Sequence, residues 1–553
     1  MELALGAELF QTPDREAFAS VLIAGRPHTF RIASTHFGLW LAKVYYDATG
    51  RAPGANALSD AKTILKGRAL FGGPELRAHV RMAEHEGRSY IDLGGSDGRI
   101  VEIDADGWRV LDHPPVRFWR PSGLLPLPEP LTGGNVNELW DFVNVAEGDR
   151  PLVLGWIVFA MRPTGPFPIY IFNGEQGSCK STTSRVLRAL IDPNKSSIRA
   201  EPRDPRDLVI AAANGWVVAF DNLSGVQPSL SDALCRLATG GGIATRTLYT
   251  DTEETILDVQ RPAILNGISD LTNRSDLLDR AILSTLPCIA ETHRETESEF
   301  WQRFEERRPY IFGAFLDALS TGLRRQSSVL LAGRPRMADF AVFATAAEPS
   351  LGLADGEFMA AYEGNRMAAH EAALDGSQVA QELLRFLDRL GPAGFSGEPS
   401  ELLRILNQGR SDNRAPAGWP LGPRHLTSVL SRLAPNLRAV GIEVITGHDA
   451  GRAHGGRRRI VVRKVGEATV TTVTNAIPKP LQPELRLVAP QPFDVNRHPD
   501  EIDRHRPSPP SRDVELNGDP GGGGDGTDPV PDQAWAPPDA HLGASGDLEA
   551  ALP

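Results

Sequence analysis

Hydrophobic and polar positions follow different periodicities along the chain and divide it into successive regions. Residues 1–130 combine short strand-like runs with two amphipathic helical stretches, which predicts a small N-terminal α/β domain. Residues 135–295 alternate apolar strand runs with helical periodicity, a pattern typical of a parallel sheet flanked by helices. Helical periodicity continues through residues 296–375, and residues 377–465 predict two or three helices followed by Arg-rich strands.

The rest of the chain has the composition of linkers. A Pro-rich stretch at 120–134 predicts a connection between domains, and Pro, Gly and Asp dominate residues 470–553, which predicts a disordered tail. The net charge of −12 would argue against a nucleic-acid partner. Much of that acidity lies in the tail, however, and local charge matters more than the total in a multidomain chain.

Composition narrows the class of protein. The 41% of hydrophobic and 23% of charged residues are ordinary for a soluble globular protein. Three cysteines without a CxxC pattern favour a reducing compartment and argue against a zinc or disulfide framework. The longest apolar run, at 151–161, is too short to span a bilayer, and the first residues lack the features of a signal peptide. We therefore expect a cytoplasmic protein without a membrane partner.

The strongest motif is PIYIFNGEQGSCKSTTSRVLRALI, at 168–191. An apolar strand runs into a Gly-rich loop, and an amphipathic helix follows, which is the arrangement that offers backbone amides and a helix N-terminus to phosphates. Lys180 is expected to contact the β- and γ-phosphates of ATP, and the Ser181 hydroxyl to ligate Mg²⁺. The alternative is a chance Gly-rich turn. The predicted nucleotide-binding residues are Gly174, Glu175, Gln176, Gly177, Ser178, Cys179, Lys180, Ser181 and Thr182.

A second strand, WVVAFDN at 216–222, ends in Asp221. A carboxylate at this position beside a P-loop is expected to organise Mg²⁺. The next residue is Asn222, where a glutamate usually polarises the attacking water, and asparagine can orient a water but cannot take its proton. Cys179 likewise stands where the glycine before the lysine is usual. These two departures leave the efficiency of hydrolysis open.

Two further polar residues follow apolar elements. Asn266 ends the strand at 262–265 and is a candidate sensor of the γ-phosphate, with a strand-end turn as the alternative. Arg280 follows a short helix and is a candidate for stabilising transition-state charge in a neighbouring subunit. Its alternative is a surface ion pair with Asp276 or Asp279.

The order of P-loop, WVVAFDN, LATGGGIATRTLY, PAILNGI and LLDRAI resembles superfamily 3 helicases, and especially the helicase half of phage and plasmid primase-helicases. The resemblance covers roughly 150–290 and implies an AAA+ core, a homo-oligomeric ring that is most often a hexamer, and a pore hairpin that grips single-stranded DNA. Arg246, with Tyr249 nearby, is the matching candidate for phosphate contact and base stacking. A Gly-rich surface hairpin is the alternative.

Residues 377–465 resemble the winged-helix domain that often follows such cores. Two helices precede a third that begins at Pro423, and an Arg-rich two-stranded wing comes after it. Clustered guanidinium groups bind phosphates and give salt-dependent affinity, and duplex DNA is the candidate partner in this region; docking of a protein is the alternative. The candidate DNA-binding residues are Arg424, Arg457, Arg458 and Arg459, and the wing also carries Arg463 and Lys464.

Taken together, these patterns predict an α/β protein with an AAA+ P-loop NTPase core, an N-terminal α/β domain, a helical segment, a winged-helix domain and a disordered tail. The favoured function is an ATP- and Mg²⁺-dependent DNA helicase or translocase of a phage-type or mobile-element replication system. Lys180, Asp221, Asn222, Asn266 and Arg280 are its candidate catalytic residues. The alternatives are a nucleotide-gated DNA-binding regulator or initiator that hydrolyses ATP weakly, and an ATPase scaffold that recruits proteins.

Overall fold

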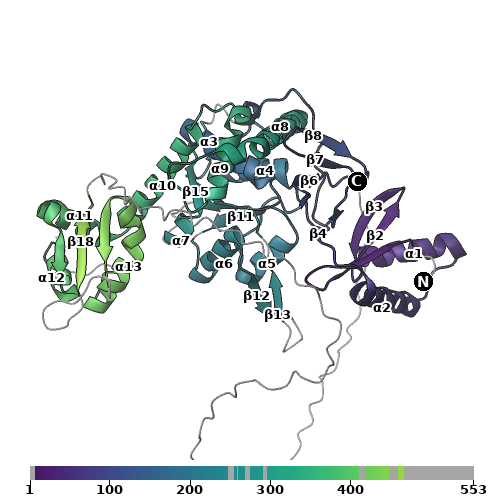
Figure 1. Cartoon of the computed structure of the whole chain (residues 1–553), viewed down its shortest axis with the longest axis horizontal. Coiled ribbons are helices and arrows are strands. Elements are labelled where there is room, and N and C mark those ends of the chain that lie inside the picture. Colours follow the sequence, from purple (N-terminus) through teal and green to yellow (C-terminus); the bar gives the residue numbers. More distant parts are fainter. Residues whose placement is uncertain are drawn as a thin grey trace, which may run out of the picture. The chain divides into compact units, whose positions relative to one another are not determined.

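The computed structural model describes residues 6–223, 225–246, 254–257, 260–267, 275–290, 295–409, 418–446 and 459–465, with the backbone alone for 243–246 and 254–257. The chain divides into two compact units, Met1–Thr471 and Thr472–Pro553, and all described residues belong to the first (Figure 1). The predicted tail at 470–553 therefore lies outside the described residues, as do Tyr249, Arg457 and Arg458.

The N-terminal residues form a three-stranded antiparallel sheet with two helices. Along the middle strand, Ala17, Ala19 and Val21 share one cluster with Phe37 and other helical residues, while Phe18 on the opposite face is also buried and stacks on Phe10. Residues of one face recur with the period of two of a strand, and both faces of this strand are covered. The elements are β1 (Glu8–Gln11), β2 (Ala17–Ile23), β3 (Arg26–Arg31), α1 (Thr35–Thr49) and α2 (Ala55–Gly72).

A second, four-stranded antiparallel sheet follows before residue 112. Part of its buried face, including Ile91, Val101 and Ile103, belongs to the same hydrophobic cluster as the helices of the central region. The domain boundaries expected from the sequence stay predictions. The strands of this sheet are β5 (Met82–His85), β6 (Arg88–Asp92), β7 (Ile100–Ile103) and β8 (Trp108–Leu111), and a separate parallel pair consists of β4 (Ala78–His79) and β9 (Arg117–Phe118).

The central region contains a parallel sheet of four strands in the order β11-β14-β10-β15. Both faces are covered, since Tyr170 and Phe172 join one hydrophobic cluster while Ile169 and Ile171 join another. Such double burial explains why these strands read as continuous apolar runs. The elements are η2 (Val136–Asp141), η3 (Glu147–Asp149), α3 (Arg150–Ala160), β10 (Ile169–Asn173), α4 (Lys180–Ile191), α5 (Pro205–Ala213), β11 (Val218–Leu223), α6 (Pro228–Thr239), β12 (Ile243–Arg246), β13 (Glu254–Leu257), β14 (Ala263–Gly267), α7 (Ser275–Leu278) and β15 (Ala281–Thr285).

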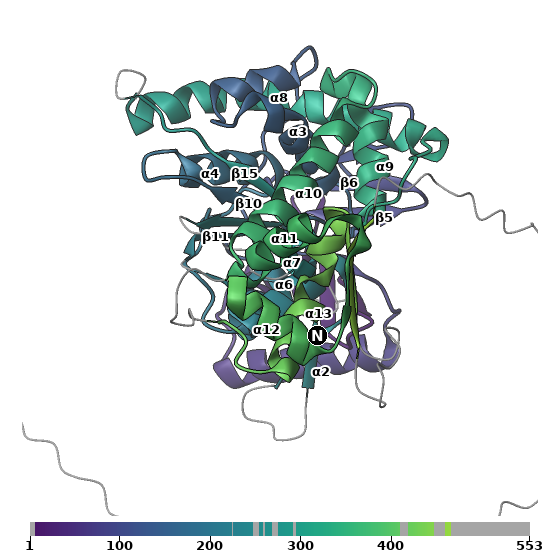
Figure 2. The same cartoon turned by 90° about the vertical axis from the view of Figure 1, so that its left-hand side faces the viewer.

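Helices cover the two faces of this sheet, which lies between α8 and α6 in both views (Figures 1 and 2). The predicted helical stretch is confirmed, with α8 (Glu297–Arg325), η5 (Gln326–Ser328), α9 (Ala338–Ala347), η6 (Glu348–Leu351) and α10 (Glu357–Asp375). The apolar run noted in the sequence is the buried helix α3, every residue of which from Pro151 to Ala160 is inaccessible to solvent. Within the described ranges, no helix is both long and apolar enough to cross a membrane.

The last described elements form a compact group with its own hydrophobic cluster. A three-stranded antiparallel sheet, in the order β16-β18-β17, packs with three helices. The elements are α11 (Gln378–Leu390), η7 (Gly391–Ala393), β16 (Phe395–Gly397), α12 (Pro399–Gly409), α13 (Pro423–Ala439), β17 (Ile442–Ile445) and β18 (Ile460–Lys464). We call the part from α11 to β18 the C-terminal domain.

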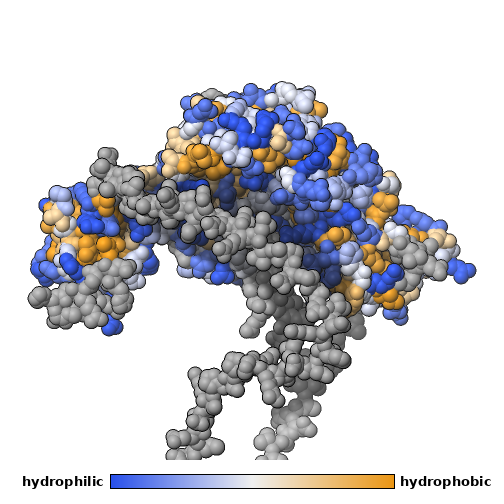
Figure 3. All heavy atoms as spheres, in the orientation of Figure 1, coloured by the Kyte–Doolittle hydropathy of each residue, from blue (hydrophilic) through white to orange (hydrophobic). Residues whose placement is uncertain are grey.

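The described surface on the face in Figure 3 is mostly hydrophilic, with hydrophobic residues scattered over it. The exposed large hydrophobic side chains include Leu22, Leu39 and Phe71 in the N-terminal part. Scattered exposure of this kind is normal for folded proteins.

Candidate nucleotide site

The loop between β10 and α4, predicted to bind phosphate, has two glycines in backbone conformations that other residues rarely adopt. Gly174 has a φ of 147° and Gly177 a φ of 87°, values that favour glycine. A Cβ on Gly174 would lie 2.8 Å from the Ser178 hydroxyl oxygen and 2.9 Å from the Leu286 carbonyl oxygen. The loop therefore closes tightly before the helix begins at Lys180.

Lys180 turns back into this loop. Its Nζ donates to the carbonyl oxygens of Gly174 at 2.7 Å and Glu175 at 2.8 Å. The ammonium group thus lies against this loop, in which Glu175 to Gly177 are exposed to solvent. A cation and the amides of a first helical turn come together here, which is the chemistry that phosphates require.

Asn144 holds the loop from outside, a role that no sequence motif indicated. Its Nδ2 donates to the carbonyl oxygen of Ser178 at 3.2 Å and to that of Pro287 at 2.6 Å. The amide therefore joins the loop to the segment that follows β15.

Polar side chains from three elements meet beside the loop. The Ser181 hydroxyl donates to Asp221 Oδ2 at 2.7 Å, and Asn266 Nδ2 donates to Asp221 Oδ1 at 3.0 Å. The Ser184 hydroxyl, one turn further along α4, donates to Asn266 Oδ1 at 2.8 Å. Ser184 and Asn266 are both fully buried. The Asp221 carboxylate can only accept, so it selects the nitrogen of the Asn266 amide, and Ser184 then donates to the oxygen.

The position of Asp221 follows from an irregularity in β11. The register against β14 shifts between Phe220 and Leu223, as in a β-bulge. Asn222 occupies the bulge with a φ of 56° and an exposed side chain. Asparagine is one of the residue types that tolerate this left-handed conformation. The bulge therefore offers a backbone reason for asparagine at this position, which the sequence had not indicated.

The far end of α4 is fastened by buried charges. Arg81 and Asp192 are completely buried, and Arg81 Nε lies 3.0 Å from Asp192 Oδ1. Asp192 Oδ2 accepts from the backbone amides of Trp216 and Val217, which lead into β11. Burial lowers the pKa of the neighbouring Arg188 to about 10, so this guanidinium stays charged at neutral pH. The network ties the P-loop helix to the strand that carries Asp221.

Arg280 lies just after α7, at the entry to β15. Its Nη1 donates to the carbonyl oxygen of Asp276 at 2.6 Å, a contact with backbone and not with a carboxylate. Its Nε is buried, with no hydrogen-bond partner among the described residues. The structure therefore places Arg280 in the turn beyond α7, apart from the Ser181–Asp221–Asn266 group.

The expected hairpin is confirmed in its backbone. Strands β12 and β13 pair antiparallel, with Arg246 opposite Glu254. Gln260 secures its base, since its Nε2 donates to the Thr239 carbonyl oxygen at 3.0 Å. The Arg246 side chain lies outside the described part of the chain.

The basic residues of the C-terminal domain differ in their partners. Arg424 is exposed in the first turn of α13, and Arg459 Nε donates to the Ser396 hydroxyl at 2.6 Å. Arg463 forms a two-nitrogen contact with Glu443, and Lys464 lies 2.7 Å from Asp388. The ion pairs neutralise Arg463 and Lys464 within the domain itself, so the basic character of the wing is weaker there than the sequence indicates.

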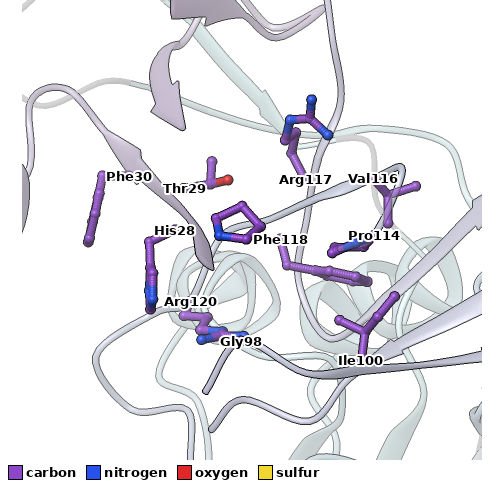
Figure 4. A pocket seen from close by; sticks show the side chains of 11 residues that line it. His28, Thr29, Phe30, Gly98, Ile100, Pro114, Val116, Arg117, Phe118 and Arg120 are labelled. Atoms are coloured by element: carbon purple, nitrogen blue, oxygen red, sulfur yellow. The ribbon is translucent and has the colours of Figure 1, made fainter. Parts of the chain in front are cut away.

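A small cavity of about 50 Å³ lies between β3 and residues 98–120 (Figure 4). His28 and Arg120 line it, and burial together with the Arg120 charge lowers the pKa of His28. Arg120 is already bound through two nitrogens to Asp92. This cavity contains none of the P-loop residues and is a packing junction between the two N-terminal sheets.

Comparison with known proteins identifies the family of this chain. Residues 136–365 match the model of the actinomycete integrative conjugative element replication protein, and residues 379–475 match the model of the C-terminal domain of that protein. Together the two matches span more than half of the chain. The chain belongs to this replication-protein family. A comparison with curated proteins gives no match.

Two solved structures show some similarity to this chain. The apo structure of the NrS-1 C-terminal region is 12% identical with a TM-score of 0.38, covering 84% of this chain and 97% of that one. A JCV helicase with a bound acetamide compound is 12% identical with a TM-score of 0.19, covering 40% of this chain and 68% of that one. These likenesses assign no role to any residue of this replication protein.

Proposed function

We propose that this replication protein is an ATP-binding, Mg²⁺-dependent DNA helicase or translocase. The observation that carries the proposal is the convergence of Lys180, Ser181, Asp221 and Asn266 at the carboxyl ends of neighbouring parallel strands. Ligands of open α/β sheets bind at this edge. These residues come from three separate motifs, and their meeting at one place is what a triphosphate site requires.

The residues suit ATP with Mg²⁺. Ser181 and Asp221 present a hydroxyl and a carboxylate oxygen 2.7 Å apart, and oxygen is the ligand that Mg²⁺ prefers. The residues of the loop, from Gly174 to Thr182, would hold the phosphates with Lys180 as the cation. Ser181 and Asp221 would hold the metal ion, which would supply neutralisation of charge on the phosphates. Asn266, whose amide nitrogen donates to Asp221, would sense the γ-phosphate.

The wider architecture of the proposal is an AAA+ core that assembles as a ring, most simply a hexamer. Arg280 would reach the nucleotide of the neighbouring subunit, and Arg246 would contact single-stranded DNA in the pore. A winged helix is supported by the order α11, β16, α12, α13, β17 and β18 with an antiparallel sheet. Its candidate DNA contacts are Arg424, Arg457, Arg458 and Arg459.

The test is ATP turnover with and without single-stranded DNA. Wild type should hydrolyse ATP faster with DNA, and Lys180→Ala should remove turnover in both conditions because it removes the cation at the phosphates. Lys195→Ala, which changes an exposed lysine shortly after α4, is the matched control and should behave as wild type. Wild type that neither binds nor hydrolyses ATP would refute the proposal.

The second candidate is a nucleotide-gated DNA-binding regulator that hydrolyses ATP weakly. Asn222 favours it, since this residue replaces the usual glutamate and occupies a left-handed bulge. Asn222→Gly separates the two, because glycine keeps the backbone and removes the amide. For a motor in which Asn222 orients water, turnover should fall about tenfold or more, about 1.4 kcal/mol in barrier. Tight ATP binding with negligible turnover in both proteins would establish the regulator.

A further inference from the structure

His370 lies at a buried junction between the central region and the C-terminal domain. It belongs to α10 and is 5% exposed. Its Nδ1 lies 3.1 Å from Oδ1 of Asn436, a 4%-exposed residue on α13. Its Nε2 lies 3.7 Å from Asp279 Oδ1. One imidazole ring thus contacts both parts of the molecule.

Asp279 is the residue directly before Arg280. Its amide donates to the Ser275 carbonyl oxygen at 3.0 Å, and its second carboxylate oxygen lies 3.9 Å from Arg336 Nη1. The Arg280 amide donates to the Leu277 carbonyl oxygen at 3.0 Å, within the same turn. The carboxylate that His370 contacts therefore helps to fix the turn that carries Arg280.

The helix that bears His370 is also attached to the nucleotide-binding sheet. The Asn365 side chain of α10 accepts from the amide and donates to the carbonyl of Leu283 on β15. Strand β15 pairs directly with β10, which leads into the P-loop. The α10 helix is therefore anchored on the nucleotide side, and His370 makes a side-chain hydrogen bond from it to α13, beside the apolar packing of Leu374.

Helix α13 joins this junction to the predicted DNA surface. Arg424 lies in its first turn and Asn436 in its last turn, about 18 Å apart at 1.5 Å per residue. A displacement of the first turn by DNA would be carried along the helix to Asn436. Among the described residues, His370 is the hydrogen-bond partner of the Asn436 side chain.

We propose that His370 is a positioning residue that couples DNA on the C-terminal domain to the Asp279–Arg280 turn. The coupling rests on the proposed function, since it regulates the same ATP site through Arg280. DNA that moves α13 shifts Asn436, and His370 transmits that shift to Asp279. The bond between His370 and Asn436 is thus the element through which DNA binding changes ATP turnover.

Two conservative variants test the two contacts of His370, one with Asn436 and one with Asp279. His370→Asn places an amide near the position of Nδ1, and His370→Gln places one near that of Nε2, so each keeps one contact and loses the other. We expect both to lower the ratio of turnover with DNA to turnover without DNA by about fivefold or more, the lower end of typical allosteric coupling. Glu371→Gln, an exposed change on the next residue of α10, should keep the wild-type ratio.

DNA affinity and the thermal unfolding midpoint distinguish coupling from damage. Both should stay near wild type in His370→Asn and His370→Gln. If both variants keep the wild-type ratio of turnover with DNA to turnover without DNA, the proposed coupling through His370 is wrong and the proposed function still stands. The same conclusion follows if the ratio falls only because DNA affinity falls. Wild type without ATP turnover would instead overturn the proposed function, and the coupling with it.

Discussion

In the nucleotide site, Ser184 and Asn266 are fully buried, and hydrogen bonds join the side chains of Ser181, Asp221, Asn266 and Ser184. In the C-terminal domain, Arg424 is exposed and Arg463 is already paired with a carboxylate of its own domain. A buried, satisfied network sets geometry before any ligand arrives. Exposed arginines add weak, salt-screened contributions. Single substitutions should therefore act strongly on rate in the first region and weakly on affinity in the second.

The largest effect is expected at Asp221. Asp221→Asn removes the charge beside Ser181 while nearly preserving its shape, so ATP turnover should fall about a hundredfold or more, as for loss of one electrostatic group in other active sites. Turnover against Mg²⁺ concentration measures it. Asp355→Asn, at an exposed position, is the control. Turnover close to wild type in Asp221→Asn would show that the carboxylate does not serve the metal ion.

A smaller effect on rate is expected at Ser184. Ser184→Ala frees the Asn266 amide to rotate, so kcat should fall about tenfold, about 1.4 kcal/mol, while ATP affinity stays within about twofold. Thr183→Val is the matched control. The Thr183 hydroxyl is buried on the same helix with no hydrogen-bond partner among the described residues, so its loss should not matter. Equal losses in both variants would assign the effect to packing of α4.

In the C-terminal domain, Arg459→Ala should weaken DNA binding several-fold. It should also lower the slope of log affinity against log salt concentration by about 1. Arg463→Ala, on the strand that follows Arg459, is the control, because Glu443 already neutralises Arg463. Binding titrations at several salt concentrations measure both. A larger loss for Arg463→Ala than for Arg459→Ala would mean that the ion pair opens on DNA.

The central sheet was predictable from the sequence because strands buried on both faces leave unbroken apolar runs, as Ile169–Phe172 shows. Lys180, Ser181 and Asp221 were predictable because their spacing from those strands is fixed by the backbone. The sequence also predicted the helices of the C-terminal domain from their apolar periodicity. Local patterns of this kind survive folding unchanged.

Contacts between distant elements could not be predicted in this way. Ser184 lies three residues after Ser181 on the same helix face, a spacing that offered a clue, but its bond to Asn266 depends on how α4 packs on the sheet. Asn144 and His370 gave no signal, because their partners lie 34 or more residues away in the sequence. The neutralising partner of Arg463 likewise appears only when β17 and β18 pair.

The smallest expected effect concerns backbone strain, which the nucleotide site contains at Cys179. This residue has a φ of 61° and a ψ of 30°, a left-handed conformation that costs a residue with a Cβ about 1–2 kcal/mol. Cys179→Gly relieves that strain but loses about 0.5–1 kcal/mol to greater freedom of the unfolded chain, so the net gain should be below about 1 kcal/mol. The thermal midpoint should rise by a few degrees at most, about 2–4 °C per kcal/mol for a domain of this size. Cys179→Ala keeps the Cβ and should give no rise. If the thermal midpoint rises equally in Cys179→Ala, the effect comes from loss of the thiol. The Cβ at position 179 would then not destabilise the P-loop.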